Sequence, residues 1–228
     1  MTLVESQNMN SAIFDLDGTL IDSMKVWEKI DADFLAKRGL SVPPDYFGAI
    51  SALGFRETAN YTIKRFGLRD SAEDLTREWN DMAYHEYARN IRLKPYAREY
   101  LTKLKSMKVK LAVATSSPSV LCNAALSNNG IAGYFDVIQT ADSAYSSSAE
   151  IYDKRSPRVF LQAADKLSVQ PERCAVFEDI LRAVRSAKAA GMTVYAVYDE
   201  SSKEDWEEIK READGFLYDF KDAPLIGM

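Results

Sequence analysis

The chain has little histidine and little cysteine: of its 228 residues, one is His and two are Cys. His85 stands in a stretch whose apolar residues recur at helical spacing, which argues against chemistry centred on histidine. Cys122 and Cys174 lie in apolar surroundings without the spacing of a metal site, so they are interpreted as buried free thiols. Free thiols are typical of a reducing compartment, and we expect a cytoplasmic protein.

Long apolar runs and blocks of basic residues are also absent. No stretch approaches the roughly 18 apolar residues that cross a bilayer, and the start of the chain does not resemble a secretion signal. The formal net charge of −5 argues against general binding to nucleic acid or to an anionic membrane. Hydrophobic residues make up 46% of the chain, enough for a sizeable core. We therefore expect a soluble globular protein with a small-molecule partner, as a monomer or a weak homo-oligomer.

What the chain does contain is an alternation of short apolar runs with helical patterns. Strands are predicted at 12–14, 109–114, 135–139, 174–177, 193–197 and 215–218. Such alternation predicts an α/β fold of the Rossmann-like class, with a parallel sheet flanked by helices.

About ninety residues separate the first two predicted strands. Within them, residues 23–92 carry apolar side chains at helical spacing, and turn-forming clusters interrupt the pattern at 39–44, 54 and 67–70. We therefore predict an α/β core made of residues 1–21 and 93–228, and an inserted domain of three or four helices at residues 22–92.

Two carboxylates follow the first predicted strand, in the sequence Asp15-Leu16-Asp17-Gly18. Ionised side chains at the tip of a buried strand carry a desolvation cost that a bound cation offsets. This pattern is typical of a magnesium-dependent nucleophile beside its acid/base partner. Taken alone, it also fits an ordinary turn at the end of a strand.

Further polar residues follow the later strands: Thr115-Ser116-Ser117, Lys154 and Glu178-Asp179. Ligands of a parallel sheet bind beyond the carboxyl ends of its strands, so we expect these residues to lie together with the first pair. Singly, they could be a helix cap, a solvated lysine and a helix N-terminal acid pair. Together they supply a nucleophile, a proton donor, ligands for a cation and groups that neutralise phosphate oxygens, which indicates phosphoryl transfer.

These clusters, in this order, resemble the four motifs of the haloacid dehalogenase superfamily, in its phosphatase and beta-phosphoglucomutase-like branch with a helical cap inserted after the first strand. The resemblance covers nearly the whole chain. It implies that Asp15 attacks phosphorus and forms an aspartyl-phosphate, and that Asp17 acts as the acid and base. It further implies that Mg²⁺ is held by Asp15, the backbone carbonyl of Asp17 and Asp179, with Glu178 as a further ligand or a neighbouring acceptor.

The same resemblance assigns the phosphate contacts. Gly18, Thr115 and Ser116 would contact the phosphate together with Asp15, and Lys154 would neutralise charge on both Asp15 and the phosphate. Arg56, at the start of a predicted helix in the insert, is a candidate contact for the rest of the substrate. The alternative is a solvated surface arginine.

The leading hypothesis is a magnesium-dependent phosphatase for a small phosphorylated metabolite, and a sugar phosphomutase of the beta-phosphoglucomutase type is the enzymatic alternative. Dehalogenase activity is disfavoured because the dehalogenases of this family lack an acid at the position of Asp17. The chain departs from the family pattern around Lys154 and after Asp179, where Ile180 replaces a serine. These departures support a third hypothesis, a non-catalytic phosphate-binding or regulatory protein.

Overall fold

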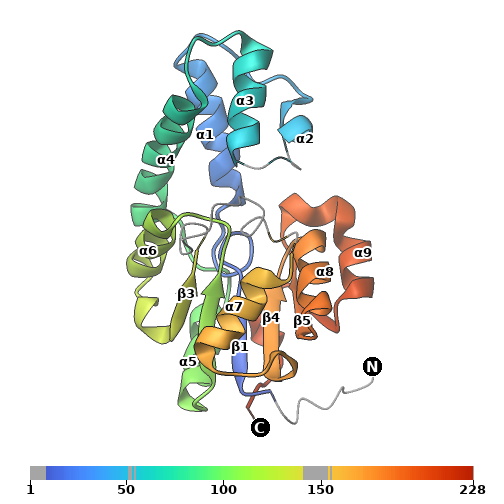
Figure 1. The fold of residues 1–228 in the computed structure, drawn as a ribbon. Helices are drawn as coiled ribbons and strands as arrows, with labels where there is room; N and C mark the ends of the chain where they lie inside the picture. The colour runs from blue at the N-terminus through green and yellow to red at the C-terminus, as the bar shows by residue number, and fades with distance from the viewer. Residues whose placement is uncertain (1–8, 51–52, 54, 141–153, 155, 228) are drawn as a thin grey trace.

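A parallel sheet forms the centre of the computed structural model, which describes residues 9–50, 53, 55–140, 154 and 156–227 (Figure 1). Its six strands run in the order β3-β2-β1-β4-β5-β6, and every neighbouring pair is parallel. In chain order they are β1 (Ser11–Phe14), β2 (Lys110–Ala114), β3 (Val137–Gln139), β4 (Cys174–Glu178), β5 (Thr193–Val197) and β6 (Gly215–Leu217). The predicted α/β class is confirmed.

Helices cover both faces of the sheet. Successive strand residues point to opposite sides, so each face carries apolar side chains that the helices bury. Phe14 packs on one face with residues of α5 and α6, and Ile13 packs on the other with residues of α7, α8 and α9. The helices are α5 (Ala97–Ser106), α6 (Ser119–Asn128), α7 (Arg158–Leu167), α8 (Leu181–Ala189) and α9 (Trp206–Glu212). All four residues of β1 are buried, as a central parallel strand requires.

Four consecutive helices follow β1 and form the group above the sheet in Figure 1. They are α1 (Met24–Ala36), α2 (Tyr46–Ile50), α3 (Phe55–Phe66) and α4 (Ala72–Arg89). We call residues 22–92 the helical segment. Its interior includes Phe34 of α1, edge-on to Trp79 of α4 with ring centroids 5.4 Å apart, and α4 also packs along α6. None of the helices in the described part of the chain is both long and apolar enough to cross a membrane.

The chain passes between the sheet and the helical segment twice, at adjacent points. Ile21 and Leu93 form an antiparallel bridge, and the Lys94 N–H donates to the carbonyl of Leu20 at 2.8 Å. Because the segment follows the carboxyl end of β1, it lies over the edge of the sheet at which ligands of parallel sheets bind.

Candidate active site

Three buried carboxyl groups meet where the two central strands end. β1 runs directly into Asp15, and β4 ends at Glu178, which Asp179 follows. Phe14 pairs with Phe177 across the strands, and the N–H of Asp15 donates to the carbonyl of Phe177 at 3.0 Å, so the side chains that follow are neighbours. One carboxylate oxygen from each of the three acids lies within 4.8 Å of the others. The structure thus brings together three of the residues predicted to hold a metal.

Lys154 lies against these carboxylates although it is far from them in the chain. Its ammonium group donates hydrogen bonds to Asp15 and to Glu178, and the residue is 2% exposed. Its backbone has a φ of 56°, and its carbonyl accepts from the hydroxyl of Ser186 at 2.7 Å. Burial lowers the pKa of Lys154, but Asp15 and Glu178 raise it further, so its pKa lies above the usual value and the group is cationic.

A single ammonium group does not neutralise the three acids. Burial raises the pKa of Asp15 to about 8, since the lowering by Lys154 is opposed by Glu178 and Asp17. Burial, followed by the charges of Asp15 and Glu178, raises the pKa of Asp179 well above its usual range. Ionising all of them at neutral pH therefore requires more positive charge than the side chains supply.

The donor set fits a divalent cation that prefers oxygen ligands. Thr19 donates its hydroxyl to Oδ1 of Asp179 at 3.1 Å, while Oδ2 of Asp179 is buried and has no hydrogen-bond partner among the described residues. An orphaned carboxylate oxygen beside two further carboxylates is what an ion such as Mg²⁺ or Ca²⁺ would satisfy. This group of carboxylates could hold a divalent metal.

Gly18 is required by this arrangement, and Gly18→Ala is expected to weaken divalent metal binding by about 10- to 100-fold. The residue has a φ of +80°, and a Cβ on it would collide with Oδ2 of Asp179. Calorimetric titration with MgCl₂ measures the effect.

Gly67→Ala is the control, because Gly67 has a φ of +62° but open space around it. Gly67→Ala should cost about 1 kcal/mol of unfolding free energy and leave metal affinity unchanged. Unchanged affinity in Gly18→Ala would contradict the assignment.

Asp17 lies beside this group, and its carboxylate is bound by hydroxyl groups. Ser23 donates to Oδ1 at 2.7 Å, Ser117 donates to Oδ2 at 2.6 Å, and Tyr87 also donates to Oδ1. Burial, and then the charge on Asp17, raises the pKa of Tyr87 well above its usual value, so this phenol remains a donor. Residues of three different parts of the chain thereby hold the carboxylate of Asp17 in place.

The predicted phosphate contacts of the second motif follow β2. Thr115 is buried, and its Oγ1 accepts from the N–H of Ser117 at 3.0 Å. The hydroxyl hydrogen of Thr115 remains available to an acceptor outside this turn. Ser116 is exposed at the same edge of the sheet, shortly before α6 begins.

Arg56 is not brought to the other predicted residues. It lies in the first turn of α3, and its side chain is 75% exposed and pairs with Glu73 of α4 at 2.5 Å. This is the solvated helix-surface arginine that the sequence left open as the alternative. The preceding Gly54 lies outside the described residues.

The hydroxyl donors to Asp17 were not predicted from the sequence. Ser117 belongs to the Thr-Ser-Ser cluster that was predicted to lie at the site, but its hydrogen bond to Asp17 was not predicted. Ser23 has the sequence signature of a helix cap rather than of a site residue. Tyr87 is one of several residues that recur at helical spacing in the insert, and such a pattern predicts that the side chain packs in the interior of the helical segment.

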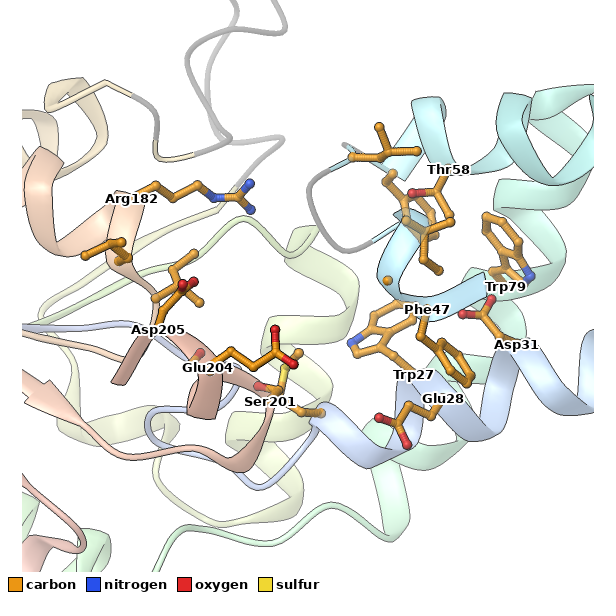
Figure 2. Close-up of a pocket in the computed structure, with 18 of the residues that line it drawn as sticks. Trp27, Glu28, Asp31, Phe47, Thr58, Trp79, Arg182, Ser201, Glu204 and Asp205 are labelled. Carbon is orange, nitrogen blue, oxygen red and sulfur yellow. The ribbon is translucent and has the colours of Figure 1, made fainter. Parts of the chain in front are cut away.

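A cleft of about 780 Å³ lies between the helical segment and the core (Figure 2), and none of the predicted site residues is among the described residues that line it. Its wall includes Ile180, which directly follows Asp179, and Met24, which directly follows Ser23. The residues that the figure labels are Trp27, Glu28, Asp31, Phe47, Thr58 and Trp79 from the helical segment and Arg182, Ser201, Glu204 and Asp205 from the core.

Comparison with known proteins identifies the family. The family model of the haloacid dehalogenase-like hydrolases matches residues 12–197. A protein of Thermotoga maritima named phosphorylated carbohydrates phosphatase is 28% identical over 190 residues, covering 83% of this chain and 85% of that protein. The fructose-1-phosphate phosphatase YqaB of Escherichia coli is 28% identical over 180 residues, covering 79% and 92%.

A solved structure is similar over most of the chain. The crystal structure of a Thermotoga maritima protein provisionally assigned as a beta-phosphoglucomutase has a TM-score of 0.73 and 26% identity, covering 92% of this chain and 94% of that one. These findings confirm the resemblance on which the motifs were interpreted. The chain belongs to the haloacid dehalogenase-like hydrolases.

Proposed function

We propose that this hydrolase is a magnesium-dependent phosphatase that removes phosphate from a small phosphorylated carbohydrate through an aspartyl-phosphate on Asp15. The observation that carries the proposal is the buried group of Asp15, Lys154, Glu178 and Asp179, with Asp17 beside it. Relatives named as phosphatases of phosphorylated carbohydrates and of fructose-1-phosphate support the substrate class.

In the first step, a carboxylate oxygen of Asp15 attacks phosphorus while the bond from phosphorus to the leaving oxygen breaks. Asp17 would act as the general acid and give a proton to the leaving oxygen. In the second step, water attacks the phosphorus of the aspartyl-phosphate and gives a proton to Asp17. Phosphate leaves and the Asp15 carboxylate is restored, so both groups end as they began.

The other residues stabilise charge during these steps. Lys154 contacts Asp15 directly and would neutralise the phosphoryl oxygens that approach it. Thr115 and Ser116, at the end of β2, would donate to the same oxygens. Mg²⁺ held by Asp15, Asp179, the carbonyl of Asp17 and, directly or through water, Glu178 would supply the remaining positive charge.

The cleft is suited to the part of the substrate that leaves. Asp31 faces it without a hydrogen-bond partner among the described residues, and burial raises its pKa to about 7. A carboxyl group of this kind can accept hydrogen bonds from sugar hydroxyls, and the rings of Trp27 and Phe47 can pack against the C–H faces of a sugar. We propose that the helical segment, residues 22–92, acts as a cap over the site and moves about its two adjacent connections to the core.

A panel of phosphorylated metabolites tests this function. We expect phosphate release from one or more sugar or polyol monophosphates in MgCl₂, loss of that release in EDTA, and its recovery when excess MgCl₂ is restored. Isomerisation of a hexose phosphate without phosphate release would identify a phosphomutase instead. No turnover of any compound in the panel would favour a binding protein.

A further inference from the structure

A chain of donated hydrogen bonds connects the wall of the cleft to Asp17. The indole Nε1–H of Trp27 donates to the hydroxyl oxygen of Tyr87 at 3.1 Å, and that hydroxyl donates to Oδ1 of Asp17. Tyr87 is fully buried on α4, and Trp27 lines the cleft from α1. Both residues belong to the helical segment, whereas Asp17 belongs to the turn after β1.

The direction of this chain is fixed by chemistry. An indole N–H can only donate, so Trp27 occupies a lone pair of the Tyr87 oxygen and leaves the phenolic hydrogen for Asp17. A hydroxyl group that accepts a hydrogen bond is polarised by it and donates its own hydrogen more strongly. Tyr87 therefore presents a directed donor to one oxygen of Asp17, in contrast to Ser23 and Ser117, whose hydroxyl groups can rotate.

We infer that Tyr87 is a positioning residue for Asp17. Through Tyr87, Trp27 makes the orientation of Asp17 depend on whether a leaving group is bound against the wall of the cleft. The inference rests on the proposed phosphatase function. Asp17 must bring its proton within hydrogen-bond distance of the leaving oxygen, and small misplacements of a reacting group reduce rates strongly. Trp27 and Phe55, whose ring centroids are 5.8 Å apart, both line the cleft, so a leaving group bound there would contact the indole.

Tyr87→Phe removes the hydroxyl and keeps the ring, and the comparison uses two substrates. Proton donation by Asp17 matters for an alkyl leaving group such as a sugar and much less for 4-nitrophenolate. We expect kcat/KM for the preferred sugar phosphate to fall roughly 10- to 100-fold and kcat/KM for 4-nitrophenyl phosphate to fall less than about threefold. Because kcat/KM reports the steps up to release of the leaving group, hydrolysis of the aspartyl-phosphate does not obscure the difference.

Tyr46→Phe is the matched control. Tyr46 is also buried in the helical segment, but its hydroxyl is 2.8 Å from that of Thr62, whereas the hydroxyl donors to Asp17 are Ser23, Ser117 and Tyr87. We expect this variant to retain both activities. Trp27→Phe, which removes the indole donor, should shift the ratio of the two activities in the same direction as Tyr87→Phe.

Equal losses on both substrates in Tyr87→Phe, or no loss on either, would overturn the inference and leave the proposed function standing. A wild-type protein that hydrolyses neither substrate in MgCl₂ would overturn the proposed function, and the inference with it. A selective loss on the sugar phosphate supports both.

Discussion

Asp15→Asn is expected to reduce metal-dependent phosphate release to background, a loss on the order of 10⁴-fold or more. An amide oxygen does not form the acyl phosphate that a carboxylate forms, so the first step has no nucleophile. The loss appears in phosphate release assayed at saturating sugar phosphate in MgCl₂.

Unfolding of the variant is not expected to explain that loss. Asp15→Asn removes one of three buried acids that repel one another, and Lys154 keeps its contact with Glu178. Its unfolding free energy without metal should therefore equal or exceed that of the wild type, as urea denaturation would measure. Asp81→Asn, the same change at an exposed position of α4, is the activity control and should retain full turnover. Substantial phosphate release by Asp15→Asn would contradict the assigned role.

Lys154→Met is expected to lower the unfolding free energy by about 3–5 kcal/mol in the absence of metal. The substitution leaves Asp15 and Glu178 buried without the cation that contacts both of them. MgCl₂ should recover part of the loss, since a bound divalent cation replaces some of the missing charge. Urea denaturation with and without MgCl₂ measures both effects, provided that the slope of the transition is unchanged.

A second lysine provides the comparison for Lys154. Lys188 pairs with Asp214 at 2.6 Å, but its side chain is 37% exposed. Lys188→Met should cost only about 0–1 kcal/mol, because water screens a partly exposed pair. If Lys154→Met unfolded at the same urea concentration as Lys188→Met, Lys154 would not be the buried counter-charge of the site.

The positions of the acids were predictable from the sequence because they depend on strand ends. Asp15 and Asp179 each follow a short apolar run, and alternation with helices predicts that such runs are parallel neighbours in one sheet. In-register pairing of β1 with β4 then leaves little freedom in where the next side chains lie. Lys154 was expected at the same edge of the sheet, but its contact with Asp15 was predicted only through the family resemblance, since a lone lysine between two strands carries no signal of burial.

The contacts between the helical segment and the site were not predictable in the same way. Tyr87 and Asp17 are 70 positions apart, and their contact depends on how α4 packs along α6. No local pattern encodes that packing. For Arg56, helical spacing predicted a position at the start of a helix. It did not predict the direction of the side chain, which projects into solvent and pairs with Glu73.

Trapping the covalent intermediate tests the central claim most directly. The protein is mixed with its preferred sugar phosphate and MgCl₂, quenched in acid within milliseconds, and digested for peptide mass spectrometry. We expect one phosphoryl group on the peptide that contains Asp15, and none on the same peptide from Asp15→Asn. Rapid turnover of the substrate with no phosphoryl group on Asp15 at any quench time would contradict the account.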